Sequence, residues 1–118
     1  MPRMLIVEDE RDIAELLTEY FEMKGFAVSS TFSGEEAMER LNQEEVDVIL
    51  LDILLPGVSG LEVLRHAKVR HPNATVVMVT SLDQIDIRQE AHSCGAAAYI
   101  TKPFDFSPAT WSVVLNTP

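Results

Sequence analysis

The sequence has little cysteine, little positive charge and no long apolar run. Its single cysteine, Cys94, cannot form an intramolecular disulfide, which favours a reducing, cytoplasmic setting. Nine Lys and Arg residues face nineteen Asp and Glu residues, and the net charge of −10 argues against direct nucleic-acid binding. Since no apolar run could span a bilayer and the N-terminus lacks a signal-peptide profile, we expect no membrane contact.

Several common binding motifs are also missing. Neither G-x-x-x-x-G-K-[ST] nor G-x-G-x-x-G occurs, which excludes the usual nucleotide-binding loops. His66 and His71 are five positions apart and do not share a helix face, so a zinc or copper site is not indicated. With 118 residues and no internal repeat or low-complexity tract, residues 1–118 are expected to form one domain.

Five apolar segments alternate with five segments of helical character. Two of the apolar segments, 46–53 and 74–81, are apolar on both faces, which is typical of strands in a parallel sheet covered on each side. The sequence therefore predicts an α/β fold with a doubly wound five-stranded parallel sheet and helices on both faces. The expected strands are 4–9, 27–32, 46–53, 74–81 and 96–102.

Local signals mark the ends of the expected helices. Ser33 is a plausible N-cap of the second helix, and Gly25 stops the first. Ser107 at the cap and Pro108 at the first helical position predict a short last helix that begins there. Met23 lies at core spacing in the first helix.

Polar side chains stand at the ends of four predicted strands. In open parallel α/β sheets, ligands bind outside the carboxyl ends of the strands, so these side chains are expected to share one rim. The residues are Glu8 and Asp9 after the first strand, Asp52 near the end of the third, Thr80 and Ser81 at the fourth and Lys102 at the fifth. Asp52 is the most informative, because an ionised side chain inside an apolar run is costly unless it is paired.

These groups form a chemically consistent set. Three carboxylates carry −3, which Lys102 and one divalent cation would neutralise. Oxygen-only ligands suit a hard ion such as Mg²⁺. With that charge balanced, Asp52 could attack a phosphoryl donor and become an acyl phosphate. The Thr80 hydroxyl could then donate a hydrogen bond to a phosphoryl oxygen.

The motifs at these strand ends closely resemble one known family. They are "ED" at 8–9, "LLDILLPGVSG" at 50–60, "VTS" at 79–81 and "YITKPF" at 99–104. From about residue 4 to residue 106 the chain resembles the receiver domain of bacterial two-component response regulators. The resemblance implies a flavodoxin-like strand order of 2-1-3-4-5. It also implies phosphorelay signalling, with a histidine kinase or phosphotransfer protein upstream and an effector domain or protein downstream.

The resemblance also assigns roles to individual residues. Asp52 is the implied phosphoacceptor, and Thr80 and Lys102 are its implied catalytic partners. The implied Mg²⁺ ligands are Glu8, Asp9, Asp52 and the backbone carbonyl of Leu54. Thr80 and Tyr99 resemble the paired switch residues, the Lys102–Pro103 peptide is expected to be cis, and Gly60 matches the family glycine after the Asp52 loop.

Two features depart from the commonest pattern of that family. The acidic pair is Glu–Asp where Asp–Asp is frequent, which could alter a water-mediated metal contact. The short last helix could curtail the surface formed by the fourth helix, fifth strand and fifth helix, which leaves a homodimer open. The sequence also leaves open whether the chain is a stand-alone receiver or part of a longer regulator.

Two alternative functions remain at this level. A phosphatase with Asp52 as nucleophile would commonly carry a second acid two residues later, and that position is Leu54. We therefore expect no enzyme, only self-phosphorylation from a donor and slow self-dephosphorylation. The other alternative is a receiver-like interaction module that never takes phosphate. Loss of a site residue would favour it, and none is lost.

Overall fold

The structure, a computed structural model, describes residues 1–116. No helix within this range is both long and apolar enough to cross a bilayer. The elements, in chain order, are β1 (Arg3–Val7), α1 (Arg11–Met23), β2 (Ala27–Thr31), α2 (Gly34–Gln43), β3 (Val48–Leu51), α3 (Gly60–Arg70), β4 (Thr75–Thr80), α4 (Ile85–Ser93), β5 (Ala98–Thr101) and α5 (Ser112–Leu115).

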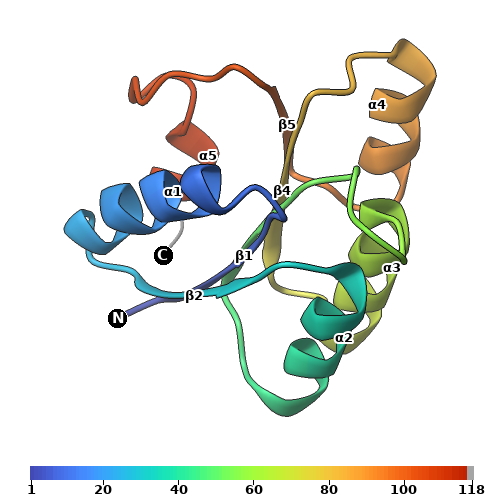
Figure 1. Cartoon of the computed structure of the whole chain (residues 1–118), viewed down its shortest axis with the longest axis horizontal. Coiled ribbons are helices and arrows are strands. Elements are labelled where there is room, and N and C mark those ends of the chain that lie inside the picture. Colours follow the sequence, from blue (N-terminus) through green and yellow to red (C-terminus); the bar gives the residue numbers. More distant parts are fainter. Residues whose placement is uncertain (117–118) are drawn as a thin grey trace.

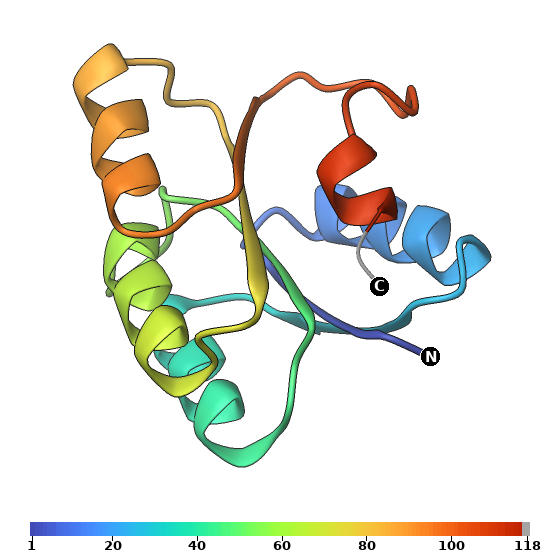
Figure 2. The same ribbon diagram turned by 180° about the vertical axis from the view of Figure 1, so that it is seen from behind.

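All five strands are parallel and form one sheet in the order β2-β1-β3-β4-β5. Figures 1 and 2 show α1 and α5 on one face of the sheet and α2, α3 and α4 on the other. The predicted doubly wound α/β fold and its strand order are confirmed.

Alternation along the central strands explains why they are apolar on both faces. In β1, Leu5 and Val7 pack toward α2, α3 and α4, whereas Met4 and Ile6 pack toward α1 and α5. In β3, every residue is buried, and odd and even positions again enter different clusters. β1, β3, β4 and β5 thus contribute to two hydrophobic cores, and helices must cover both faces of the sheet.

The buried face of α1 does not include Met23. Ala14, Leu17 and Phe21 are buried, which places the inner face at i, i+3 and i+7. Met23 is 84% exposed, so its expected place in the core is wrong. The reason is helical geometry, because a residue two positions after Phe21 points to the opposite side. Gly25, with φ of +96°, ends the helix as expected.

The last helix begins later than predicted. It spans Ser112–Leu115, so the expected start at Pro108 is wrong, although the helix is short as predicted. The preceding turn is built around Asp105, whose Oδ1 accepts hydrogen bonds from the Ser107 and Thr110 hydroxyls at 2.8 and 2.6 Å. Trp111 is fully buried, and its Nε1 donates to the Asp105 carbonyl at 2.7 Å. Residues 107–111 form a hydrogen-bonded turn ahead of the helix, in which the Ser107 Oγ accepts from the Thr110 N–H at 3.3 Å and its carbonyl from the Trp111 N–H at 3.4 Å.

The loop after β3 is packed tightly against the start of α3. The Gly60 N–H donates to the carbonyl of Ile53 at 3.0 Å. A Cβ added at Gly60 would overlap the carbonyl oxygen of Asp52 and lie 2.6 Å from Ile53 Cα. Only a glycine lets α3 approach the backbone of Asp52 this closely.

We predict that Gly60→Ala destabilises the fold by about 1–3 kcal/mol, because the added methyl group must displace backbone. Urea denaturation measures the change in the free energy of unfolding, and amide NMR shifts report movement of residues 52–55. Gly25→Ala is the control: it has open space around the Cβ but a positive φ. It should cost stability through strain while leaving those shifts unchanged. A Gly60→Ala protein with parental stability and shifts would contradict the prediction.

Candidate functional site

Four strands deliver the candidate site residues to one rim. Glu8 directly follows β1, Asp52 follows β3, Thr80 ends β4 and Lys102 follows β5. The sheet hydrogen bonding continues into these positions, since the Asp52 N–H donates to the Val7 carbonyl at 3.0 Å and the Lys102 N–H to the Thr80 carbonyl at 2.9 Å. The backbone positions of the site are therefore set by the sheet itself.

The ammonium group of Lys102 is the centre of the site. Its Nζ lies 2.7 Å from Glu8 Oε1, 2.9 Å from Asp52 Oδ2 and 3.2 Å from Glu10 Oε1. The side chains of Glu8 and Asp52 are only 2% and 4% exposed, and that of Lys102 is 9% exposed. The Lys102–Pro103 peptide bond is cis, as the resemblance implied. Two buried carboxylates and one buried ammonium thus form a charged cluster on the hydrophobic core.

Burial and pairing act in opposite directions on these groups. Burial alone would lower the pKa of Lys102, but its hydrogen bonds to Glu8 and Asp52 outweigh this, so the pKa is raised. Lys102 is therefore a full positive charge at neutral pH. Burial raises the pKa of Glu8, and the hydrogen bond from Lys102 only partly opposes this.

Asp52 is held in a defined orientation from two sides. Its Oδ2 accepts from Lys102, while its Oδ1 accepts from the Leu54 N–H at 3.1 Å. This second bond closes a turn directly after the strand. Leu54 is 51% exposed at the rim, and its carbonyl as a metal ligand stays a prediction.

Glu10 was missed by the sequence reasoning. Carboxylate oxygens of Glu8, Glu10 and Asp52 lie within 4.8 Å of one another, and Asp9, which is exposed, is not in this group of the described residues. The signal was available, because side chains of an extended segment alternate sides, so Glu8 and Glu10 share a side and Asp9 does not. Asp9 as a metal ligand stays a prediction.

The donor set fits a hard divalent cation. Three carboxylates against one ammonium leave a charge of −2, which one divalent ion would balance. Carboxylate oxygens are the ligands that Mg²⁺ takes in proteins, and the described cluster holds no soft or imidazole ligand. The residues present therefore suit Mg²⁺ better than zinc or copper.

Thr80 and Tyr99 are linked through the backbone of Leu82. The Thr80 Oγ1, fully buried, accepts from the Leu82 N–H at 3.4 Å, and the Tyr99 hydroxyl donates to the Leu82 carbonyl at 2.8 Å. The guanidinium of Arg88 lies 4.7 Å from the centre of the Tyr99 ring, and Arg88 Nε also pairs with Asp83 Oδ1 at 2.7 Å. Both residues proposed as a switch thus contact the backbone of the same residue, Leu82, on its N–H and on its carbonyl. Ser81 is exposed.

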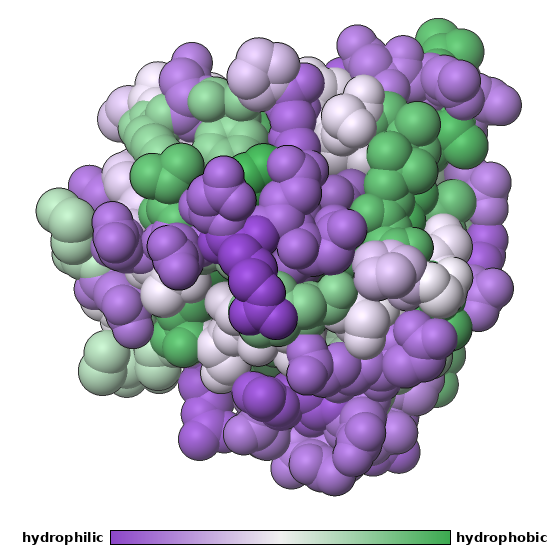
Figure 3. Space-filling model, in the orientation of Figure 1, coloured by the Kyte–Doolittle hydropathy of each residue, from purple (hydrophilic) through white to green (hydrophobic). Residues whose placement is uncertain are grey.

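The surroundings of the rim are polar on one side and apolar on the other. Figure 3 shows hydrophilic residues across the centre of the face from which α1 starts, and an apolar patch toward α4. Leu54, in the loop after β3, and Ile85, at the start of α4, are the strongly exposed apolar residues of this region.

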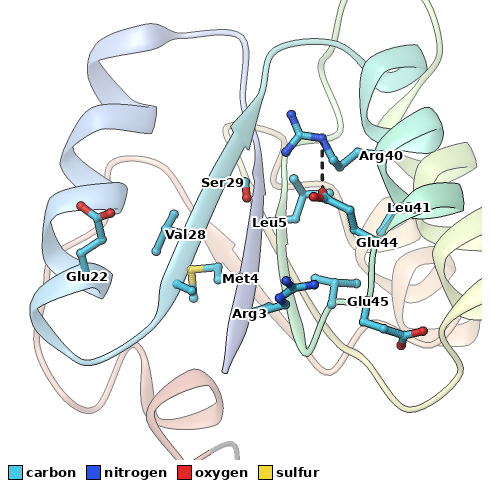
Figure 4. A pocket seen from close by; sticks show the side chains of 12 residues that line it. Arg3, Met4, Leu5, Glu22, Val28, Ser29, Arg40, Leu41, Glu44 and Glu45 are labelled. Carbon is cyan, nitrogen blue, oxygen red and sulfur yellow. Dashed lines mark ion pairs between the residues drawn. The ribbon is translucent and has the colours of Figure 1, made fainter. Parts of the chain in front are cut away.

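A separate pocket lies at the opposite end of the sheet. It is formed by the first residues of β1 and β2 together with Glu22 of α1 and the end of α2, and Figure 4 shows Arg40 and Glu44 paired with each other on the α2 side. Arg3 and Arg40 face three glutamates, so its charges largely compensate one another. None of the predicted site residues lines this pocket.

Comparison with known sequences points to one family. The profile of the response regulator receiver domain matches residues 4–110. Sporulation initiation phosphotransferase F of Bacillus subtilis is 35% identical over 103 residues, covering 87% of this chain and 83% of that protein. The response regulator SaeR of Staphylococcus epidermidis is 36% identical, covering 88% of this chain, and this chain spans only 45% of SaeR.

Solved structures agree with the sequence comparison. The response regulator TrrA of Thermotoga maritima, in complex with Mg²⁺ and BeF, superposes with a TM-score of 0.83 at 32% identity and 97% coverage of both chains. A CheY-like receiver domain from Methanospirillum hungatei gives 0.86 at 30% identity, covering 89% of this chain and 84% of that one. The chain therefore belongs to the response regulator receiver domain family, the signalling switches of two-component phosphorelays.

Proposed function

We propose that Asp52 accepts a phosphoryl group, with Mg²⁺, from a partner histidine kinase or phosphotransfer protein. The observation that carries the proposal is the buried Lys102 ammonium held 2.9 Å from Asp52 Oδ2 at the carboxyl end of a parallel sheet. A positive charge in this position favours the negative charge that an incoming phosphoryl group brings. The Mg²⁺-bound relative TrrA supports the same metal.

The site residues have different roles in the proposed phosphoryl transfer. The Asp52 carboxylate attacks phosphorus, and the bond from phosphorus to the donor's leaving atom breaks. Lys102 and the Leu54 N–H, which hold Asp52 beforehand, fix the direction of attack. Bound Mg²⁺ would supply charge neutralisation for the transferring oxygens. We propose Glu8, Asp9, Asp52 and the carbonyl of Leu54 as its protein ligands.

We predict that acetyl phosphate adds one phosphoryl group to the parent protein only when Mg²⁺ is present. Without the cation, the carboxylates repel the donor. Asp52→Asn should abolish the modification, and EDTA should reduce it to background. Intact-protein mass spectrometry measures the fraction modified.

The matched control is Asp47→Asn, because Asp47 flanks the same strand at its other end, where its Oδ2 accepts from the Arg3 N–H. This variant should be modified like the parent. Equal modification of Asp52→Asn and the parent would contradict the assignment of the acceptor.

We further propose that the protein is not a turnover enzyme. Leu54 and Leu82, two residues beyond Asp52 and Thr80, offer no base or acid to orient an attacking water. We predict slow hydrolysis of the acyl phosphate and no multiple turnover of para-nitrophenyl phosphate, both measurable by absorbance and mass spectrometry. Rapid turnover that disappears in Asp52→Asn would show a phosphatase instead.

The output is proposed to pass through the backbone of Leu82. Phosphorylation replaces a charge of −1 by about −2, which attracts nearby hydrogen-bond donors such as the Thr80 hydroxyl. If Thr80 turns toward the phosphoryl group, it releases the Leu82 N–H. The Leu82 carbonyl holds Tyr99, so this movement changes the surface of α4 and β5.

We predict that Thr80→Ala still accepts phosphate but largely loses the conformational response at Tyr99. NMR shifts of Tyr99 and residues 83–102, with and without beryllofluoride, measure that response. Thr75→Ala is the control, since Thr75 begins the same strand at its far end. If Thr80→Ala responds like the parent, the route through Leu82 is wrong.

The proposal also covers the domain organisation, the cellular location and the downstream partner. We propose that residues 1–118 act as one receiver domain in the cytoplasm and control a downstream effector domain or protein, whether on this chain or another. A homodimer through the surface of α4 and β5 is compatible with this arrangement. Retention of Asp52, Thr80 and Lys102 supports phosphorylation over a purely interacting module.

A further inference from the structure

The contact between Glu10 and Lys102 has no role in the phosphorylation scheme above. Glu10 Oε1 lies 3.2 Å from Lys102 Nζ, the longest of the three carboxylate contacts of that ammonium group. The Glu10 side chain is 59% exposed, whereas those of Glu8 and Asp52 are almost completely buried. Glu10 is therefore the one partner of Lys102 that can leave for water at little cost.

The position of Glu10 makes this contact unusual. Glu10 is the N-cap residue of α1, where a side chain commonly accepts from the free N–H groups of the first turn. Its side chain makes no such bond, and its own N–H donates to Glu8 Oε2 at 3.1 Å. The carboxylate is thus directed at Lys102 rather than at the helix.

The hydrogen bonds of Lys102 are fully used in this arrangement. An ammonium group has three N–H donors, and three carboxylates lie within 3.2 Å of it. A phosphoryl group on Asp52 would need one of these donors for its own oxygen. Glu8 is almost completely buried and has no route to water, so moving it away from Lys102 is strongly unfavourable. The exchange therefore falls on Glu10.

We propose that Glu10 is a releasable counter-ion of Lys102 that slows phosphoryl transfer to Asp52. This inference rests on the proposed function. As the bond between Asp52 oxygen and phosphorus forms and the bond from phosphorus to the leaving oxygen breaks with its electron pair, the Glu10–Lys102 pair opens. The freed N–H then binds a phosphoryl oxygen. Glu10 is a positioning residue, since it acts through Lys102.

The kinetic test compares Glu10→Gln and Glu10→Ala with the parent, using acetyl phosphate at saturating Mg²⁺ and mass spectrometry. Loss of a half-exposed ion pair should raise the rate constant about three- to five-fold. Glu10→Asp keeps the charge but is one methylene shorter, so it should also be faster than the parent. Asp12→Asn is the control, because it removes one exposed acid from the first turn of α1. Asp12→Asn should change the rate constant of phosphorylation by less than about two-fold.

A second readout does not depend on phosphorylation. The ¹H–¹⁵N signal of the Lys102 ammonium, recorded without Mg²⁺ or phosphodonor, should shift and exchange faster in Glu10→Ala than in Asp12→Asn. The Mg²⁺ concentration at half-saturation, followed by NMR titration, should rise by no more than about five-fold, because Glu10 contributes negative charge to the cluster but is not among the proposed ligands.

Each possible result distinguishes the proposed role of Glu10 from a different explanation. Equal acceleration by Asp12→Asn and Glu10→Gln would reduce the effect to overall charge and overturn the inference. A strong loss of Mg²⁺ affinity in the Glu10 variants would make Glu10 a metal ligand and also overturn it. An unchanged Lys102 signal would show that the pair does not form in solution. If the parent itself takes no phosphate, the proposed function fails, and this inference with it.

Discussion

The site depends on one interaction, the burial of a lysine ammonium between two buried carboxylates. Neither sign of charge could occupy this place alone, because an unpaired charge on the hydrophobic core costs several kcal/mol. Lys102 comes from β5, whereas Glu8 and Asp52 follow β1 and β3. A contact between these groups requires all the intervening strands to be in register. The same pairing therefore ties the chemistry of the rim to the integrity of the sheet.

Strand register and loop packing have complementary effects on this cluster. The strand register fixes the positions of Asp52 and Lys102 along the sheet. It does so because the sheet hydrogen bonds continue to the backbone of both residues. Gly60 then sets how closely α3 can approach the loop after β3. Both effects act on the backbone around Asp52 and so help to fix where its carboxylate lies.

Sequence reasoning predicted the sheet well because period-two burial and helical spacing act locally. Buried strands such as β3 and the polar residues that follow them could be placed without coordinates. Glu10 was overlooked because three consecutive acids were treated as a pair, although alternation along an extended chain puts Glu8 and Glu10 on one side. The start of α5 could not be predicted, since Pro108 and Ser107 favour a helix there. Hydrogen bonds to Asp105 and the burial of Trp111 decide otherwise.

Because the ends of the strands carry the reactive groups, chemistry and recognition reside on different residues. β1, β3 and β4 behind the rim are almost entirely buried, whereas Leu54 and Ile85 are exposed. Side-chain substitutions at Leu54 and Ile85 would change the exposed surface near Asp52 while the Leu54 N–H that holds Asp52 is kept, as long as proline is avoided. Duplicated copies of the domain could therefore differ at such exposed positions and bind different partners. They would keep the same Asp52 and Lys102. The architecture thus allows specificity to evolve faster than reactivity.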